Sequence, residues 1–422
     1  MASPVLPTDE CGTELSLQAL ADENLEEIFL RLPGPAVLAR VSLACASFRR
    51  VITERAFLRR FRKVHPPPLL GLVDDEGAFL AAQAPHPSAP LSRALADAAD
   101  FTYSFVPKPD NGTWFSRDAR DGRVLLEHGS RSVLKTVFFT DLAVCDPLSR
   151  RYVLLPSIPE DMTIPEEHLL EFRPMLAPIV DDEGECETSF KVIGVARYRS
   201  KLASFVFSSV TGQWCTAAST SWSSMGTAEP SRKRMHRFNY SRGCFYWTDL
   251  WRDKLLVLDT GGTMEFSTVD LLTGYHAQLR NQPGLSVCMS TIVGGTNGAL
   301  EMLTLVGDYR PTPTSFSLHH TVQQNNPESS GEWQLKNVME LPRRRLCSTM
   351  CATTEGFLFL PCVREAQWDD DALGLLPQDN HVDFFSLEVK TFELKQVCMA
   401  TYHPNCVHSY FGFPPSLSKP SL

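Results

Sequence analysis

The side chains of this chain that could do chemistry are scattered along it. No segment matches a glycine-rich phosphate loop, a GxSxG nucleophile elbow, an HExxH metal motif or an EF-hand loop. Twelve cysteines are present, and Cys347 and Cys351 come closest to a CxxC pair, with no second pair at zinc-site spacing. We therefore expect buried free thiols in a reducing compartment, and no catalytic residue, metal or cofactor.

Two polar clusters are the remaining candidates for binding a cation. His319 and His320 lie between an apolar segment and a polar one, and Asp369, Asp370 and Asp371 follow one another. No other ligand cluster accompanies either group. We interpret the histidine pair as an exposed strand end and the aspartates as a solvated loop.

A basic cluster and two tryptophans are candidates for binding another protein. Arg232, Lys233 and Arg234 begin a cluster that fits a nuclear signal or, as we favour, a loop facing water. Such a loop would also suit an acidic target. Most of the seven tryptophans are expected to fill the interior, whereas Trp222 and Trp368 lie in loop-like surroundings and are candidates for an exposed recognition surface.

The elements that position these groups begin with a clear helical pattern near the N-terminus. Leu25, Ile28, Phe29 and Leu32 recur with the spacing of one helix face, and acidic residues lie in the first turns. Pro33 predicts the end of that helix, because its ring disfavours an α conformation for the preceding residue.

Three further short helices are predicted before residues 66–68, which are all proline. One begins at Pro35, a second covers residues 44–52, and a third is centred on residues 57–61. A unit of about 50 residues is near the lower limit for independent stability. Its apolar residues exceed what so small a core covers, which indicates that a partner covers some of them.

Residues 17–63 resemble an F-box domain, preceded by a flexible segment at residues 1–16. The run Leu20-Ala-Asp-Glu-Asn-Leu-Glu-Glu-Ile-Phe-Leu-Arg-Leu-Pro33 matches the start of the motif, and Leu38-Ala-Arg-Val-Ser-Leu-Ala-Cys-Ala-Ser-Phe-Arg-Arg-Val-Ile52 matches its second half. Ala21 stands where the family usually has proline, and Phe48 where it usually has tryptophan. Both changes keep an apolar group.

This resemblance implies docking onto a Skp-type adaptor, and through it onto a cullin, within an SCF-type ubiquitin ligase. Carried over position by position, the docking residues are Leu20, Leu25, Ile28, Leu32, Pro33, Val37, Leu38, Val41, Cys45 and Phe48. A basic rim formed by Arg49, Arg50, Arg55, Arg59, Arg60, Arg62 and Lys63 follows, which would favour an acidic partner. The alternative is a helical bundle with an ordinary charged surface.

Length and composition limit the remaining possibilities. A chain of 422 residues predicts two or three domains, and 43% hydrophobic with 21% charged residues is typical of globular proteins. The net charge of −9 argues against a nucleic-acid binder. No signal peptide or membrane-spanning run is recognisable, so we expect a cytoplasmic protein, a nuclear one or both.

The region from residue 69 to 422 is predicted to be an all-β propeller. Four segments place a strand, a polar turn and a returning aromatic or apolar strand in the same order: 144–152, 207–214, 257–266 and 385–394. Gly331-Glu-Trp333 fits the end of a further copy. A loose period near 50 residues predicts roughly six or seven four-stranded blades.

More local predictions complete this region. Residues 69–73, 243–247 and 356–360 are expected to be strands, and Asp121-Gly122 a tight turn. Residues 81–99 are expected to form a loop with at most one helical turn, and residues 166–172 a helical turn. Long loops are expected at 157–188 and 364–381.

The propeller region resembles the C-terminal domain of the large plant F-box group, especially that of grasses. Asp146-Pro-Leu-Ser-Arg-Arg-Tyr-Val-Leu-Leu-Pro156 carries this resemblance, together with residues 49–61. The implied fold is an α + β multidomain protein, with a helical F-box followed by a propeller. The implied function is that of a non-catalytic substrate receptor whose propeller binds a target protein for degradation. The alternatives are an F-box scaffold acting outside degradation and a ligand- or carbohydrate-binding propeller with a helical leader.

Overall fold

The computed structural model describes most of the chain as two compact units. The described residues are 20–108, 112–129, 139–163, 169–178, 189–227, 238–248, 253–294, 299–309, 315–324, 331–342, 345–346, 351–354, 356–364, 381–401 and 406–412. One unit ends at Pro68 and the other begins at Leu69. Each unit is described below by itself.

The first unit contains the four short helices that the sequence predicts. They are α1 (Asp22–Leu30), α2 (Pro35–Ser42), α3 (Ala46–Thr53) and α4 (Arg55–Val64). Its core includes Phe29, whose ring meets Phe48 edge-on at 5.2 Å and Phe57 at 6.3 Å between centroids. Aromatic pairs in this geometry add to the stability gained from burial. The side chain of His65 hydrogen-bonds the carbonyl of Leu30, which ties the end of α4 to the end of α1.

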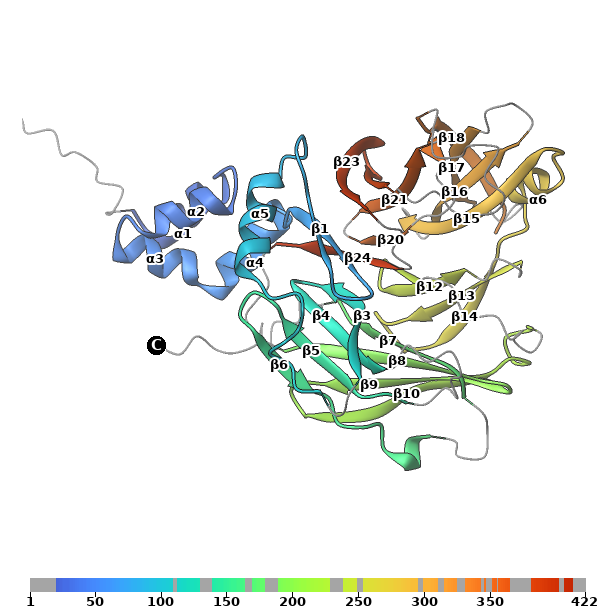
Figure 1. Cartoon of the computed structure of the whole chain (residues 1–422), viewed down its shortest axis with the longest axis horizontal. Helices are drawn as coiled ribbons and strands as arrows, with labels where there is room; N and C mark the ends of the chain where they lie inside the picture. The colour runs from blue at the N-terminus through green and yellow to red at the C-terminus, as the bar shows by residue number, and fades with distance from the viewer. Residues whose placement is uncertain are drawn as a thin grey trace, which may run out of the picture. The chain divides into compact units, whose positions relative to one another are not determined.

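The second unit is a six-bladed β-propeller (Figure 1). Five of its sheets follow one another in chain order. The first two contain β3 (Thr113–Arg120), β4 (Arg123–Gly129), β5 (Leu142–Asp146) and β6 (Arg151–Leu154), and then β7 (Leu169–Leu176), β8 (Lys191–Tyr198), β9 (Lys201–Ser208) and β10 (Gln213–Ser221). The next three contain β11 (Phe238–Ser241), β12 (Cys244–Thr248), β13 (Lys254–Asp259) and β14 (Phe266–Asp270); β15 (Leu285–Gly294), β16 (Glu301–Asp308), β17 (Ser315–Gln323) and β18 (Trp333–Glu340); and β19 (Arg345–Leu346), β20 (Cys351–Thr354), β21 (Phe357–Arg364), β22 (Val382–Glu388) and β23 (Glu393–Ala400). A 3₁₀ turn covers Glu160–Met162.

The sixth sheet joins the two ends of this unit. Strands β1 (Leu69–Asp74) and β2 (Phe79–Ala81) pair with β24 (Val407–Phe411), in the order β2-β1-β24. A Cβ at Gly71 in β1 would lie 2.4 Å from the carbonyl oxygen of Leu80, so the close approach of β2 requires glycine there. The pairing removes two exposed sheet edges.

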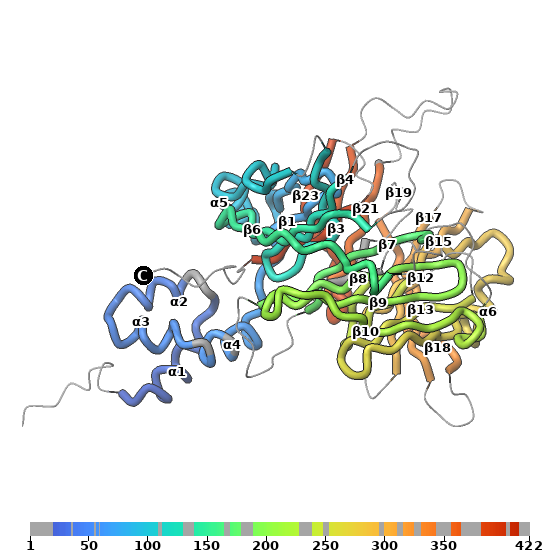
Figure 2. The backbone as a smooth tube through the Cα atoms, turned by 90° about the horizontal axis from the view of Figure 1, so that it is seen from below, coloured from blue at the N-terminus to red at the C-terminus, as the bar shows by residue number. Residues whose placement is uncertain are grey.

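The helix α5 (Ala89–Ala98) contradicts the prediction of a loop over residues 81–99. It contacts β1 and β2, and Figures 1 and 2 both show it beside β1. Pro90 suits the first turn of the helix. Ser92 is buried at the contact, where its hydroxyl donates to the carbonyl of Leu70 and accepts from the amide of Ala82.

The four repeated segments form the same element in four blades, and this confirms the predicted repeat. They are the outermost hairpins β5–β6, β9–β10, β13–β14 and β22–β23. In two of them a carboxylate closes the turn: Asp146 Oδ1 accepts from the amides of Leu148 and Ser149, and Asp259 Oδ1 accepts from the amide of Gly261. Aspartate favours such turns because its side chain bonds the backbone two residues on.

Tryptophans at the start of two outer strands tie neighbouring blades together. Trp214 in β10 donates its Nε1–H to the carbonyl of Pro156, 2.7 Å away, after the last strand of the preceding blade. Trp333 in β18 donates to Asp270 at the end of β14, at 3.0 Å. The ring of each is buried, so these residues supply both apolar contact and a directed bond between blades.

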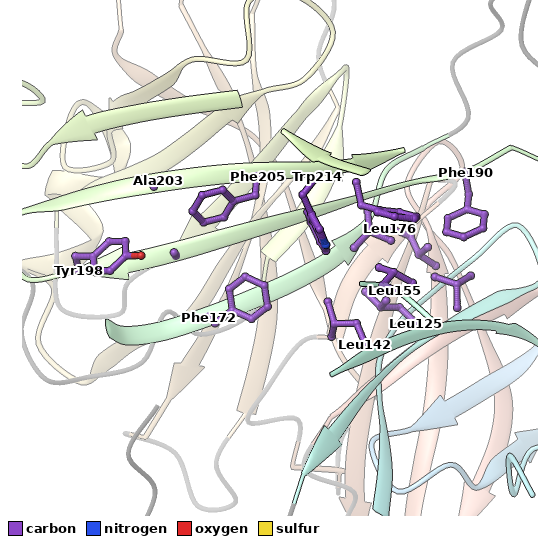
Figure 3. Close-up of a cluster of buried hydrophobic side chains, with 14 residues drawn as sticks. Leu125, Leu142, Leu155, Phe172, Leu176, Phe190, Tyr198, Ala203, Phe205 and Trp214 are labelled. Atoms are coloured by element: carbon purple, nitrogen blue, oxygen red, sulfur yellow. The ribbon is translucent and has the colours of Figure 1, made fainter. Parts of the chain in front are cut away.

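Apolar side chains fill the space between blades. The largest cluster joins the sheet β3–β6 to the sheet β7–β10, with Leu125 and Leu142 from one side and Phe172, Phe205 and Trp214 from the other (Figure 3). Similar clusters occur between the other sheets. Each blade therefore covers an apolar face that a single four-stranded sheet leaves open.

Three local predictions are wrong. Residues 169–176, which include part of the predicted helical turn and part of the predicted loop 157–188, form strand β7. His319 and His320 are 7% and 4% exposed, so they are not an exposed strand end. Cys362 is disulfide-bonded rather than a free thiol.

The buried histidines find polar partners on other elements. In the helix α6 (Tyr275–Arg280), which contacts β15 and β18, the Tyr275 hydroxyl meets His319 Nδ1 at 2.7 Å and His276 Nε2 meets the Thr321 hydroxyl at 3.0 Å. His320 Nε2 lies 3.0 Å from the Glu301 carboxylate. Burial, helped by the charge of His319, lowers the pKa of His276 from 6.5 to about 4.

A buried histidine with a lowered pKa makes the propeller less stable in acid. The folded state holds His276 neutral, while the unfolded chain binds a proton at pH 6.5, so stability is lost as the pH falls from there toward 4. Because one pKa unit corresponds to about 1.4 kcal/mol, we expect roughly 2–3 kcal/mol of this loss to come from His276.

The replacement H276Q keeps a hydrogen-bonding side chain but does not titrate. It should therefore weaken the dependence of the unfolding free energy on pH. The measurement is the free energy of unfolding by denaturant at a series of pH values. Y275F is the control, since it removes a hydroxyl from the same helix but leaves the imidazole, and should keep the wild-type pH dependence. Equal pH dependence of H276Q and wild type would contradict the assignment.

Candidate functional site

The ten residues that the resemblance assigns to docking differ widely in exposure. Ile28 and Pro33 are exposed, and Ile28 keeps 41% of its surface. Leu20, Leu32, Val37, Val41, Cys45 and Phe48 are half-buried. These eight residues retain surface that a partner could cover.

Leu25 and Leu38 are core residues in this conformation. They are 1% and 4% exposed and pack with Phe29, Val51 and other apolar residues of the helical unit. Side chains so enclosed hold α1 and α2 in place and present no surface of their own. A role in docking would be indirect, through the position of their neighbours.

The most exposed large apolar residue described in this unit was not among the candidates. Leu43 follows the last residue of α2 and keeps 72% of its surface, the largest fraction among the exposed large apolar residues. The sequence pattern does not predict the exposure of Leu43, because the residue lies within an apolar, helix-forming segment.

The basic rim is partly neutralised within the helical unit. Arg50 forms a forked pair with both carboxylate oxygens of Asp22, each at 2.7 Å. Arg60 reaches Glu26 and Glu27, each at 2.6 Å. The acidic residues of α1 therefore pair with the basic residues of α3 and α4, and neither Arg50 nor Arg60 is a free cation for an acidic partner.

The electrostatics of this surface follow from these pairs. The hydrogen bond with Arg50 lowers the pKa of Asp22, so this exposed pair persists to acid pH. Cys45 caps α3: its sulfur accepts from the amide of Phe48 at 3.5 Å and contacts the hydroxyl of Ser47 at 3.1 Å. These hydrogen bonds lower the pKa of the Cys45 thiol.

Of the candidate target-binding residues of the propeller, only Trp222 lies within the described structure, and its predicted exposure is wrong. Trp222 is 6% exposed, and its Nε1–H donates to the carbonyl of Tyr198 at 3.1 Å. It packs in the cluster with Phe245 and Trp247. Arg232, Lys233, Arg234 and Trp368 lie outside the described residues.

Two searches of the described residues give negative results. No group of three or more histidine, cysteine, aspartate or glutamate side chains is arranged to hold a metal ion there. No helix within those residues has the length and apolar character needed to cross a membrane.

Comparisons with known proteins identify no family. No protein family and no curated protein matches the chain. Among solved structures, it resembles an α-L-arabinofuranosidase of Fusarium graminearum at 12% identity and a TM-score of 0.36, covering 66% of this chain and 78% of the other. TolB of Acinetobacter baumannii matches at 10% identity and a TM-score of 0.34, covering 71% of this chain and 57% of the other.

A third similar structure is the β-propeller domain of Nup133 from Vanderwaltozyma polyspora, at 8% identity and a TM-score of 0.31. The match covers 71% of this chain and 91% of that one. Because these TM-scores are below 0.5, the similarities carry no argument about function. The site must be judged from its own residues.

The contrast between Leu25 and Ile28 predicts different effects of truncation. Leu25→Ala should destabilise the helical unit by about 2–5 kcal/mol, since it opens a cavity in the core. Ile28→Ala should change stability by only about 0.5 kcal/mol, because the side chain is exposed. Hydrogen exchange of the α1–α4 amides in the full chain measures both effects. Equal protection in the two variants would contradict the burial of Leu25.

Proposed function

We propose that this chain is the substrate-recognition subunit of an SCF-type E3 ubiquitin ligase. The helical unit, as an F-box, docks a Skp-type adaptor and through it a cullin, and the propeller binds a target protein. The chain contributes no bond chemistry of its own. It holds the target near the conjugating enzyme, which raises the effective concentration of the reacting groups.

The proposal rests on one observation above all. The segment with the F-box motif order folds into four short helices that form a compact unit separate from the propeller. This unit keeps Ile28, Pro33 and Leu43 exposed although it has a well-filled core of its own. Exposed apolar residues on a small helical unit are typical of a surface that a partner covers.

The salt bridges support a more specific role for this surface. Because Arg50 and Arg60 are paired with acidic residues of α1, the helices are held by polar contacts at the sides of the unit. Ile28, the exposed apolar residue of α1, is then left as an anchor for a groove in a partner. A few such anchors supply most of the binding energy in helix-in-groove complexes.

The propeller is a suitable receptor for a target. Its blades are joined by buried apolar clusters and by the hydrogen bonds of Trp214 and Trp333, so its loops are attached to a rigid support. The loops vary independently of the scaffold, which is why propellers with the same fold bind unrelated partners.

Replacing Ile28 by aspartate should abolish adaptor binding without unfolding the chain. A charge at an apolar anchor must be desolvated on docking, so the affinity for a purified Skp-type adaptor should fall by at least about tenfold. The dissociation constant can be measured by calorimetry, with circular dichroism as the check on folding.

V64D is the matched control, because Val64 at the end of α4 is also an exposed apolar residue of the helical unit but is not among the docking residues. It should bind the adaptor as wild type does. Wild-type affinity of the I28D variant would contradict the docking surface.

A second experiment separates a degradation receptor from a scaffold. Target proteins captured with a chain that lacks residues 20–68 should accumulate in cells when the proteasome is inhibited. If bound partners keep the same abundance with and without inhibition, the chain acts as a scaffold outside degradation.

A further inference from the structure

Arg120 is a buried cation without an ionic partner. It is the last residue of β3 and keeps 9% of its surface, and its Nε is fully enclosed without a hydrogen-bond partner. The contact that defines its position is with an aromatic ring: its guanidinium carbon lies 5.1 Å from the centroid of Tyr240 in β11. No carboxylate of the described residues forms a salt bridge with it.

Three other buried or half-buried arginines of the propeller are partnered. Arg197 forms a salt bridge with Glu171 at 3.1 Å, and Arg117 forms one with Glu127. Arg123 donates to the carbonyl of Ser189 at 2.9 Å. Arg120 therefore differs from Arg123 and Arg197 in its partners and not in its burial.

The acidic residue of β3 is already occupied. Asp118 is 6% exposed, and its two carboxylate oxygens accept from the amides of Ala119 and Leu176, each at 2.9 Å. Tyr240 does not supply a negative charge either, because burial raises the pKa of its hydroxyl while Arg120 opposes that rise. Neither group therefore forms an ion pair with Arg120.

A cation–π contact does not balance this charge. Such a contact is weaker than the cost of removing a guanidinium from water. A buried charge is stable only when it is paired, or when a bound counter-ion pairs with it. The Tyr240 ring contacts the guanidinium. The planar, forked donors of a guanidinium match the two oxygens of an oxyanion.

The position of Arg120 places this charge where strands of different blades meet. β3 and β11 are the first strands of two blades, with the sheet β7–β10 between them along the chain. The residue lies directly before the turn at Asp121-Gly122, and the carbonyl of Gly122 accepts a hydrogen bond from Tyr410 in β24 at 2.9 Å. Three blades therefore hold the residue and its turn in place.

We propose that Arg120, in contact with the Tyr240 ring, binds an oxyanion, either a carboxylate or a phosphate group. This inference does not depend on the proposed ligase function. It assigns to the propeller a site for an acidic group at the end of β3.

The test compares the thermal stability of the full chain in inorganic phosphate, acetate and chloride at equal ionic strength. Binding to the folded state raises the melting temperature. A rise in phosphate alone identifies a phosphate site, and a rise in acetate identifies a carboxylate site. No rise in either anion would overturn the proposal.

The variant R120M distinguishes this site from others. Removing an unpaired buried cation should raise the melting temperature in chloride and abolish the response to the anion, with affinity reduced by roughly tenfold or more. R242M is the control, since Arg242 is exposed and donates to the carbonyl of Ala299 at 3.0 Å. It should keep the anion response.

An anion response that R120M retains would overturn the proposal, because the anion would then bind elsewhere. If R120M does not fold, the variant R120K tests whether Arg120 binds the anion. It keeps the charge but loses the forked donors, so the proposal expects weaker anion binding, and wild-type affinity would overturn it.

Discussion

The pairing of β1 with β24 is the interaction on which the propeller depends. It joins the first strand of the unit to the last, with Leu72 opposite Ser409 and Val73 opposite His408. Without it, the sheets at the two ends would expose unpaired edges and apolar faces to water. Residues of these strands belong to two different core clusters, so the closure also joins the packing of the first and last blades.

Closure of the ring explains why the loops of the propeller can differ in sequence while its blades keep the same structure. Each blade is held to the next by apolar packing, and in two places by a tryptophan that donates to the backbone of the preceding blade. The connections are then free to vary without loss of the fold. Buried polar residues remain inside the ring, and Arg120, for which we propose an oxyanion as ligand, is one of them.

Local turn chemistry made part of the fold predictable. The repeated strand, polar turn and aromatic predicted the outer hairpins because aspartate and glycine specify the turn within a few residues. The number of blades could not be fixed in this way, since the sixth sheet is assembled from strands more than three hundred residues apart in the sequence. Helix α5 was missed for a similar reason: an alanine- and proline-rich segment gives a weak signal, and its helix depends on burial of Ser92 and Leu95 against β1 and β2.

The candidate site was predictable to a different extent. The helices and their apolar faces follow from spacing, but spacing does not separate Leu25, which is buried, from Ile28, which is exposed. The burial of Trp222 and of the histidine pair depends on partners distant in sequence, such as Tyr275 and Glu301, which no local pattern indicates. The pairing of Arg50 and Arg60 with α1 is likewise a tertiary contact, and it partly neutralises the expected basic rim.

The central claim is that the helical unit alone contacts the adaptor. The most direct measurement is hydrogen exchange of the full chain with and without a purified Skp-type adaptor. The account predicts new protection in α1–α3, around Ile28 and Pro33, with no change in the propeller strands. Protection confined to the propeller, or none in either unit, would contradict it.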